Sequence, residues 1–246
     1  GEVVDLAPPV SWFAARPLVG KRVLVTRPAA QSDPLCERLA ALGAEVLEQP
    51  AIEIADPPDW RPVDDALSRL DRFDWLVFSS ANGVRYLLGR LMATGGDVRR
   101  LGKLKLAAIG PGTAAALAAF SLRPDLVPTD YRAEGLLDCL IGDAKGKRFL
   151  LARASRGRQV LAEGLTAAEA YVEQLVVYTS RDVEAADPAV YTELAAGRID
   201  WVTVTSSAIA RALARLFGEH LRRAKLASIS PVTLVVVWGW GFLPGR

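Results

Sequence analysis

Hydroxyl-bearing residues recur at four places where an apolar run passes into a helical pattern. The four segments are Ser79-Ser80-Ala81-Asn82-Gly83, Gly110-Pro111-Gly112-Thr113, Thr205-Ser206-Ser207 and Ser230-Pro231-Val232-Thr233. In a parallel sheet the carboxyl ends of the strands meet at one edge, and the N–H groups of a helix start favour carboxylates or phosphates. Four such starts, two in each lobe, suit a ligand with several anionic groups held between lobes. The same side chains are also ordinary helix caps, and both interpretations stay open.

Arginines follow two of the predicted strands. Arg27 and Arg153 end equivalent strands, and Arg156 and Arg158 come shortly after the second of them. A guanidinium at a strand end can hold a carboxylate through two hydrogen bonds. The alternative is a solvated surface arginine, which is the favoured interpretation for Arg156.

Two similar strand patterns differ at one position, where only the second has a tyrosine. Residues 170–180 form an extended pattern of β-branched and aromatic residues, and residues 44–54 form a similar pattern 126 positions earlier. Tyr178 takes the place of Ile52. Because a phenol is a neutral hydrogen-bond donor at pH 7, Tyr178 is a candidate catalytic group. It could equally be one more strand aromatic like Tyr171, and residue types alone do not choose between the two.

The composition narrows the chemistry that the chain can perform. The 246 residues are 51% hydrophobic and 24% charged with a net charge of +2, so we expect neither nucleic acid nor a membrane as a partner. His220 is the only histidine, while Cys36 and Cys139 stand alone, which argues against a zinc site and a Cys/His or Ser/His catalytic pair. The most apolar run, residues 232–243, is too short to span a bilayer. We expect a cytoplasmic protein that holds no metal.

A glycine pattern, Gly110-x-Gly112-x-x-Ala115, resembles a dinucleotide-binding fingerprint after a strand. Two observations weigh against it: the repeat of this segment has Ser230 and Val232 in place of the glycines, and no acidic residue follows on the next strand. A nucleotide-dependent enzyme is therefore the weaker alternative.

Strand and helix patterns alternate along the chain and then start again. Residues 21–27 return as residues 147–153, and Asp74-Trp75 returns as Asp200-Trp201, both 126 positions later; further on the offset becomes 120. This alternation predicts an α/β fold with two similar lobes and parallel sheets. The second copy lacks the end of the first after Thr233, so we expect its last stretch to be truncated or altered and to pack poorly.

Several motifs together resemble the uroporphyrinogen-III synthase family over residues 20–233. They are Val25-Thr26-Arg27-Pro28, Phe78-Ser79-Ser80-Ala81-Asn82-Gly83-Val84, Ala108-Ile109-Gly110-Pro111-Gly112-Thr113-Ala114, Ala133-Glu134-Gly135-Leu136-Leu137, Leu150-Leu151-Ala152-Arg153-Ala154 with Gly157-Arg158, Val177-Tyr178 and Val204-Thr205-Ser206-Ser207. Their order and spacing carry the resemblance. In addition, residues 1–18 resemble the junction at which a uroporphyrinogen-III methyltransferase domain precedes the synthase in fused proteins.

This resemblance implies two flavodoxin-like lobes joined by a two-stranded β-ladder, with lobes that do not coincide with the two sequence repeats. The implied parts are a linker or upstream tail at 1–19, one lobe at 20–43 with 184–246, connecting strands at 44–56 and 170–183, and a second lobe at 57–169.

The family converts hydroxymethylbilane to uroporphyrinogen III in tetrapyrrole biosynthesis, which leads to haem and cobalamin. The reaction loses water and inverts ring D through a spiro intermediate, without a metal or organic cofactor. The resemblance places the functionally sensitive tyrosine at Tyr178. The substrate-binding residues that we expect are Arg27, Ser79, Ser80, Asn82, Gly83, Gly110, Thr113, Arg153, Arg158, Thr205, Ser206, Ser207 and Thr233. Ser230 departs from the glycine that the family usually has.

The resemblance also implies partners: hydroxymethylbilane synthase upstream, and a uroporphyrinogen-III methyltransferase that is fused or separate. We expect the protein itself to be a monomer. The principal alternative function is that of a non-catalytic, two-lobe protein that binds a multi-anionic ligand.

Overall fold

The computed structural model describes residues 16–228, and the chain divides into two compact units. Of the described residues, 16–53 and 181–228 form unit 1, and Ile54–Ser180 form unit 2. The chain therefore passes between units twice, once within β3 (Ile52–Ala55) and once within β7 (Tyr171–Asp182). Each unit is described separately below.

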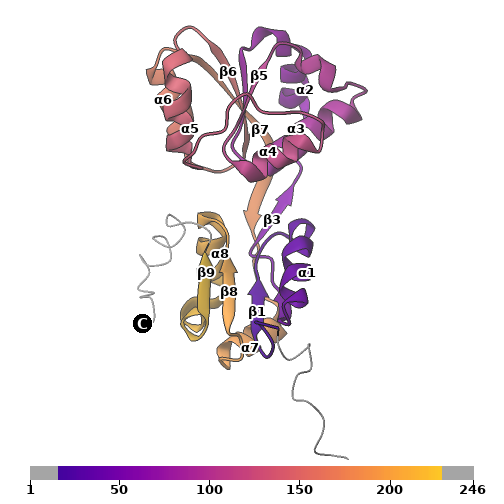
Figure 1. Ribbon diagram of the computed structural model, residues 1–246, viewed down its shortest axis with the longest axis vertical. Helices are drawn as coiled ribbons and strands as arrows, with labels where there is room; N and C mark the ends of the chain where they lie inside the picture. The colour runs from indigo at the N-terminus through magenta and orange to yellow at the C-terminus, as the bar shows by residue number, and fades with distance from the viewer. Residues whose placement is uncertain (1–15, 229–246) are drawn as a thin grey trace, which may run out of the picture. The chain divides into compact units, whose positions relative to one another are not determined.

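Unit 1 is built on a four-stranded parallel sheet in the order β2-β1-β8-β9 (Figure 1). Its strands are β1 (Arg22–Val25), β2 (Glu45–Glu48), β8 (Trp201–Val204) and β9 (Lys225–Ser228). Its helices are α1 (Asp33–Ala41), α7 (Pro188–Ala195) and α8 (Ser207–Phe217), with short 3-10 turns η2 (Ala29–Gln31) and η6 (Gly218–Arg223). β1 lies inside the sheet, which explains why Val23, Leu24 and Val25 are fully buried.

Unit 2 holds a five-stranded sheet in the order β3-β7-β6-β4-β5. Its remaining strands are β4 (Trp75–Phe78), β5 (Lys105–Ala108) and β6 (Arg148–Ala154). Its helices are α2 (Arg61–Ser68), α3 (Ala81–Ala93), α4 (Pro111–Ala118), α5 (Ala133–Leu140) and α6 (Val160–Ala167), with 3-10 turns η3 (Leu70–Arg72), η4 (Val98–Leu101) and η5 (Ile141–Asp143).

Helices cover both faces of this sheet, as Figure 1 shows. One apolar cluster joins α2, α3 and α4 to the sheet through residues such as Leu67, Leu87 and Leu117. A second cluster joins α5 and α6 to it through Leu136 and Leu165. The predicted α/β fold with parallel sheets is confirmed.

The strand pairing shows that the two sequence copies exchange strands. In unit 1, Val23 of the first copy pairs with Trp201 of the second, and in unit 2, Trp75 of the first copy pairs with Phe149 of the second. Val23 and Phe149 are 126 positions apart, as are Trp75 and Trp201. Each sheet therefore pairs strands of the two copies in the same register, with β3 added at the edge of the unit 2 sheet, and the internal duplication predicted from the sequence is present in the fold.

The stretch 44–54 differs from the single extended strand expected from the sequence. It forms β2, which pairs with β1, and then β3, which neighbours β7; between them Pro50 has no N–H to donate. Its counterpart β7 continues without a break over 12 residues. As the residue number rises along β7, the number of its partner near β3 falls. Thr179 donates to the carbonyl of Ala55, and Arg181 pairs with Glu53. The N–H of Val183 donates to the carbonyl of Ala51. This is the pattern of an antiparallel ladder.

Two further sequence expectations concern the ends of the copies. The weak strand expected at Leu126-Val127-Pro128 is reduced to a single bridge between Leu126 and Ala107. The expected poor packing after Thr233 concerns residues outside the described range. Within residues 16–228, every helix is too short or too polar to cross a membrane.

Candidate functional site

The strongest constellation of predicted site residues lies in unit 2, where β7 meets the start of α3. The Tyr178 Oη lies 3.1 Å from the Ser80 Oγ, and either hydroxyl can donate. Ser80 is the N-cap of α3: its extended backbone turns the side chain back to accept the N–H of Gly83 at 3.0 Å. Ser80 thus serves as a cap and contacts the candidate catalytic phenol at the same time.

Gly83 is required by close packing at this helix start. A Cβ there would lie 3.1 Å from the carbonyl oxygen of Ala152 on β6, closer than ordinary contacts. The missing side chain lets α3 approach the sheet, so that Ser80 reaches β7. This accounts for Gly83 by packing; its predicted contact with substrate stays a prediction.

Tyr178 is enclosed by its neighbours. Its side chain is only 7% exposed, and its ring stacks on that of Tyr86 with centroids 5.4 Å apart. Burial raises the pKa of the Tyr178 phenol, while Ser80, Asn82 and the positive charge of Arg156 act in the opposite direction. The phenol therefore stays protonated at neutral pH and is available as a hydrogen-bond donor.

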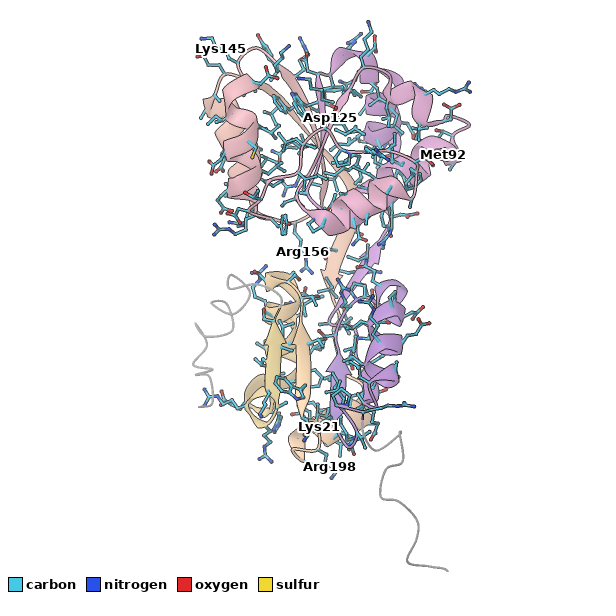
Figure 2. The ribbon with its side chains drawn as sticks, viewed as in Figure 1. Lys21, Met92, Asp125, Lys145, Arg156 and Arg198 are labelled. Atoms are coloured by element: carbon cyan, nitrogen blue, oxygen red, sulfur yellow. The ribbon has the colours of Figure 1, made fainter. Side chains whose placement is uncertain are left out.

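The loop after β6 closes around the same part of β7. The N–H of Ser155 donates to the carbonyl of Tyr178 at 2.9 Å, and the N–H of Ser180 donates to the Ser155 Oγ at 3.3 Å. Arg156 donates to the Ser180 Oγ through Nε at 3.3 Å and Nη2 at 3.1 Å. Figure 2 shows Arg156 at the end of unit 2 where β7 leaves it. Burial lowers the pKa of Arg156, and Tyr178 partly offsets that effect.

Two predicted arginines, Arg153 near the end of β6 and Arg158 in the loop after it, are engaged within the protein. Arg153 donates to Gln159 at 2.8 Å, to the carbonyl of Gly157 at 3.2 Å and to Gln174. Arg158 forms an ion pair with Glu134 of α5, which lowers the pKa of that carboxyl. To hold a substrate carboxylate, Arg158 would have to share or exchange this partner.

The other predicted residues of unit 2 lie at two neighbouring strand ends. Ser79 is exposed and Asn82 is half-buried at the start of α3. After β5, Gly110 is buried beneath Tyr131, whose Cβ would be 3.2 Å from an added Cβ, and Thr113 is buried in the first turn of α4. Packing against Tyr131 gives Gly110 a structural role that needs no nucleotide.

The remaining predicted residues belong to unit 1. Arg27 is half-buried after β1, and Thr205 follows β8. Ser206 caps α8 by accepting the N–H of Ile209 at 3.2 Å, and Ser207 begins that helix. Thr233 and the departure at Ser230 lie outside the described residues.

Three neighbours of Tyr178 do not appear among the residues predicted from the sequence: Tyr86, Ser155 and Arg156. Tyr86 lies four residues after Asn82, one helical turn along the same face of α3. That spacing could have pointed to it. Arg156 was interpreted as a surface arginine, although it is half-buried beside Tyr178.

Among residues 16–228 there is no group of three His, Cys, Asp or Glu side chains that could hold a metal ion. The functional groups of the predicted site are hydroxyl groups, a buried phenol, arginines and the N–H groups of capped helix starts.

Comparisons with known proteins all point to the same family. The family model described as "Uroporphyrinogen-III synthase HemD" matches residues 33–242. The uroporphyrinogen-III synthase of Synechococcus elongatus is 32% identical over 229 residues, which are 92% of this chain and 85% of that protein. A putative uroporphyrinogen-III synthase of Methanothermobacter thermautotrophicus is 33% identical over 85% of this chain and 86% of its own length.

Solved structures show the same fold. A mutant uroporphyrinogen III synthase from Thermus thermophilus aligns with a TM-score of 0.66 at 22% identity, over 91% of this chain and 90% of that one. The Helicobacter pylori uroporphyrinogen-III synthetase aligns with a TM-score of 0.57. None of these matches supports a non-catalytic binding protein. The match over most of its length shows that the chain belongs to the uroporphyrinogen-III synthase family.

Proposed function

We propose that this protein cyclises hydroxymethylbilane to uroporphyrinogen III, with loss of water and inversion of the last pyrrole ring. The observation that carries the proposal is the family match over residues 33–242. The arrangement of unit 2 supports it, since a buried, protonated phenol at a capped helix start is suited to assist the departure of a hydroxyl group.

The pyrroles of the substrate supply most of the driving force for this reaction. Electron density from the first pyrrole breaks the C–O bond of the hydroxymethyl group, and the Tyr178 phenol passes a proton to the departing oxygen, which leaves as water. The resulting azafulvenium ion is attacked by the last pyrrole at its already substituted carbon, which gives a spiro intermediate. That intermediate reopens and recloses with the ring inverted, and the proton released on rearomatisation returns to the phenolate.

The protein must also hold eight substrate carboxylates and keep the chain folded. We assign this work to the helix starts after β4, β5 and β8 and to Arg27, Arg153 and Arg158. Helix N–H groups and guanidinium groups are the donors that carboxylates prefer. In this proposal Ser80 aligns the phenol, and Asn82 lies in the same turn of α3.

The product isomer tests this function. The purified protein is supplied with hydroxymethylbilane, the products are oxidised, and the I and III isomers are separated by chromatography. We expect the III isomer in excess over a reaction without protein, because spontaneous closure gives the I isomer. Only the I isomer at the uncatalysed rate would contradict the proposal.

The substrate also defines the partners. Hydroxymethylbilane synthase would supply the bilane, and the resemblance of residues 1–18 to a fusion junction extends the proposal to a uroporphyrinogen-III methyltransferase, fused or separate. A pull-down with each purified enzyme, and the native mass of the full-length protein, would test these two associations.

A further inference from the structure

The loop residues Ser155 and Arg156 are bonded to β7 at Tyr178 and at Ser180. The N–H of Ser155 donates to the carbonyl of Tyr178, and the N–H of Ser180 donates to the Ser155 Oγ. The Arg156 guanidinium donates two hydrogen bonds to the Ser180 Oγ, at 3.3 and 3.1 Å. Side chains two positions apart on a strand share a face. Ser180 therefore holds the guanidinium on the face of β7 that carries the Tyr178 ring.

This placement matters for a phenol that gives up a proton. The charge of Arg156 and the Tyr178 phenol influence each other, and burial makes a phenolate at this position costly. A cation beside the oxygen reduces that cost when the proton moves to the leaving hydroxyl. Ser80 already accepts the N–H of Gly83, and its own proton can point to the phenol oxygen.

The repeated half of the chain shows that the fold does not need this loop chemistry. At the positions equivalent to Ser155, Arg156, Tyr178 and Ser180, the first copy has Ala29, Ala30, Ile52 and Ile54. All four change from polar to apolar together. Because the first copy forms β1, β2 and β3 without these polar groups, the repeated pattern itself does not require them, and the polar set is confined to the copy that carries the phenol.

We propose that Arg156 is a positioning residue that acts through Tyr178: its guanidinium, held by Ser180, orients the phenol and stabilises the phenolate formed during loss of water. This inference rests on the proposed function.

Kinetics of four variants test it: Arg156→Gln, Arg156→Lys, Tyr178→Phe and the double variant Arg156→Gln/Tyr178→Phe. We expect Arg156→Gln to lower kcat on the order of ten-fold with KM within about two-fold, and Arg156→Lys to recover much of the loss. The double variant should be no slower than Tyr178→Phe, since Arg156 acts only through the phenol. Arg148→Gln is the matched control, because Arg148 also lies over a tyrosine, Tyr171, at 5.0 Å, and this variant should leave kcat and KM unchanged.

Distinct outcomes would overturn the inference. A raised KM with unchanged kcat in Arg156→Gln would make Arg156 a substrate carboxylate ligand, and a double variant slower than Tyr178→Phe would show independent action. A fall in melting temperature that matches the loss of activity, in both Arg156 variants, would make the role structural. Full activity in Tyr178→Phe would instead refute the donor role in the proposed function, whereas an inactive Tyr178→Phe beside a fully active Arg156→Gln would refute only this inference.

Discussion

Units 1 and 2 are built from the same repeated pattern, yet only unit 2 carries a phenol at the crossing strand. The shared parts correspond closely: Asp74 and Asp200 each accept a backbone N–H from the first residue of a neighbouring strand, at 2.8 and 2.9 Å. Ser80 and Ser206 each cap the helix after an equivalent strand. The shared residues therefore build the fold, and those that differ are the candidates for function.

The residues that differ between the two copies lie close to Tyr178. The stacked pair Tyr178 and Tyr86 of unit 2 corresponds to Ile52 and Ala212 in the other copy, and Asn82 corresponds to Ala208. Ile52 and Ala212 are buried apolar residues. The other copy thus has apolar residues at both aligned positions, so the repeated pattern itself does not require a phenol there.

The largest expected effect comes from removing the phenol hydroxyl. Tyr178→Phe should lower turnover on the order of ten-fold or more, because the leaving hydroxyl loses its proton donor. The melting temperature should change by no more than about 3 °C, because one hydrogen bond is lost while the stacking on Tyr86 remains. Isomer-resolved kinetics and thermal melting measure the two effects, and parallel losses of activity and stability would make Tyr178 structural.

The next comparison concerns the shared carboxylates. Asp74→Ala and Asp200→Ala should each lower the free energy of unfolding of their unit by about 1.5 kcal/mol, at the low end for charge-assisted hydrogen bonds because both side chains are partly exposed. Urea unfolding measures this. A loss confined to one variant would show that the two units are not stabilised in the same way.

The two helix caps should contribute equally to stability and differ only in their effect on the Tyr178 phenol. Ser80→Ala and Ser206→Ala should each cost about 1 kcal/mol of stability through the lost cap. Only Ser80→Ala should also alter the ultraviolet absorbance titration of Tyr178, identified by its absence in Tyr178→Phe. An identical titration in Ser80→Ala and the parent protein would mean that the Ser80–Tyr178 contact has no influence on the phenol.

The smallest expected effect is on acid stability. Hydrogen bonds from Arg198 and Arg22 lower the pKa of Glu193 to about 2. Since the folded pKa is below the unfolded value near 4.5, the stabilisation is complete above about pH 4.5 and is lost as the pH falls toward 2. Melting temperature against pH should therefore fall less steeply for Glu193→Gln than for the parent protein over that range, and equal slopes would contradict the assignment.

Much of the architecture could be predicted because it depends on local patterns. Apolar runs, capping serines and the 126-residue offset point to parallel strands and a duplicated fold. The exchange of strands between copies follows from long-range pairing, for which a sequence offset carries no signal; the family resemblance alone implied it. The break at Pro50 was missed because the surrounding residues still read as one extended segment.

The candidate site could be predicted only in part. Ser80 and Tyr178 were each identified, but their contact joins residues 98 positions apart and depends on how closely α3 packs on β6. The residue type alone favours a solvated surface arginine at position 156, whereas its partial burial accompanies the bonds between that loop and β7. Whether the predicted residues bind substrate awaits the variants described above.

The exchange of strands also sets the order in which the protein can form during synthesis. Unit 2 is one continuous segment, whereas β1 and β8 of unit 1 are joined by contacts between residues as far as 179 positions apart. The ribosome therefore releases the whole of unit 2 before β1 can meet its central partner. Until then Val23, Leu24 and Val25 lack one of the two strands that flank them in the sheet, so β1 and β2 wait for their remaining partners after unit 2 has been made.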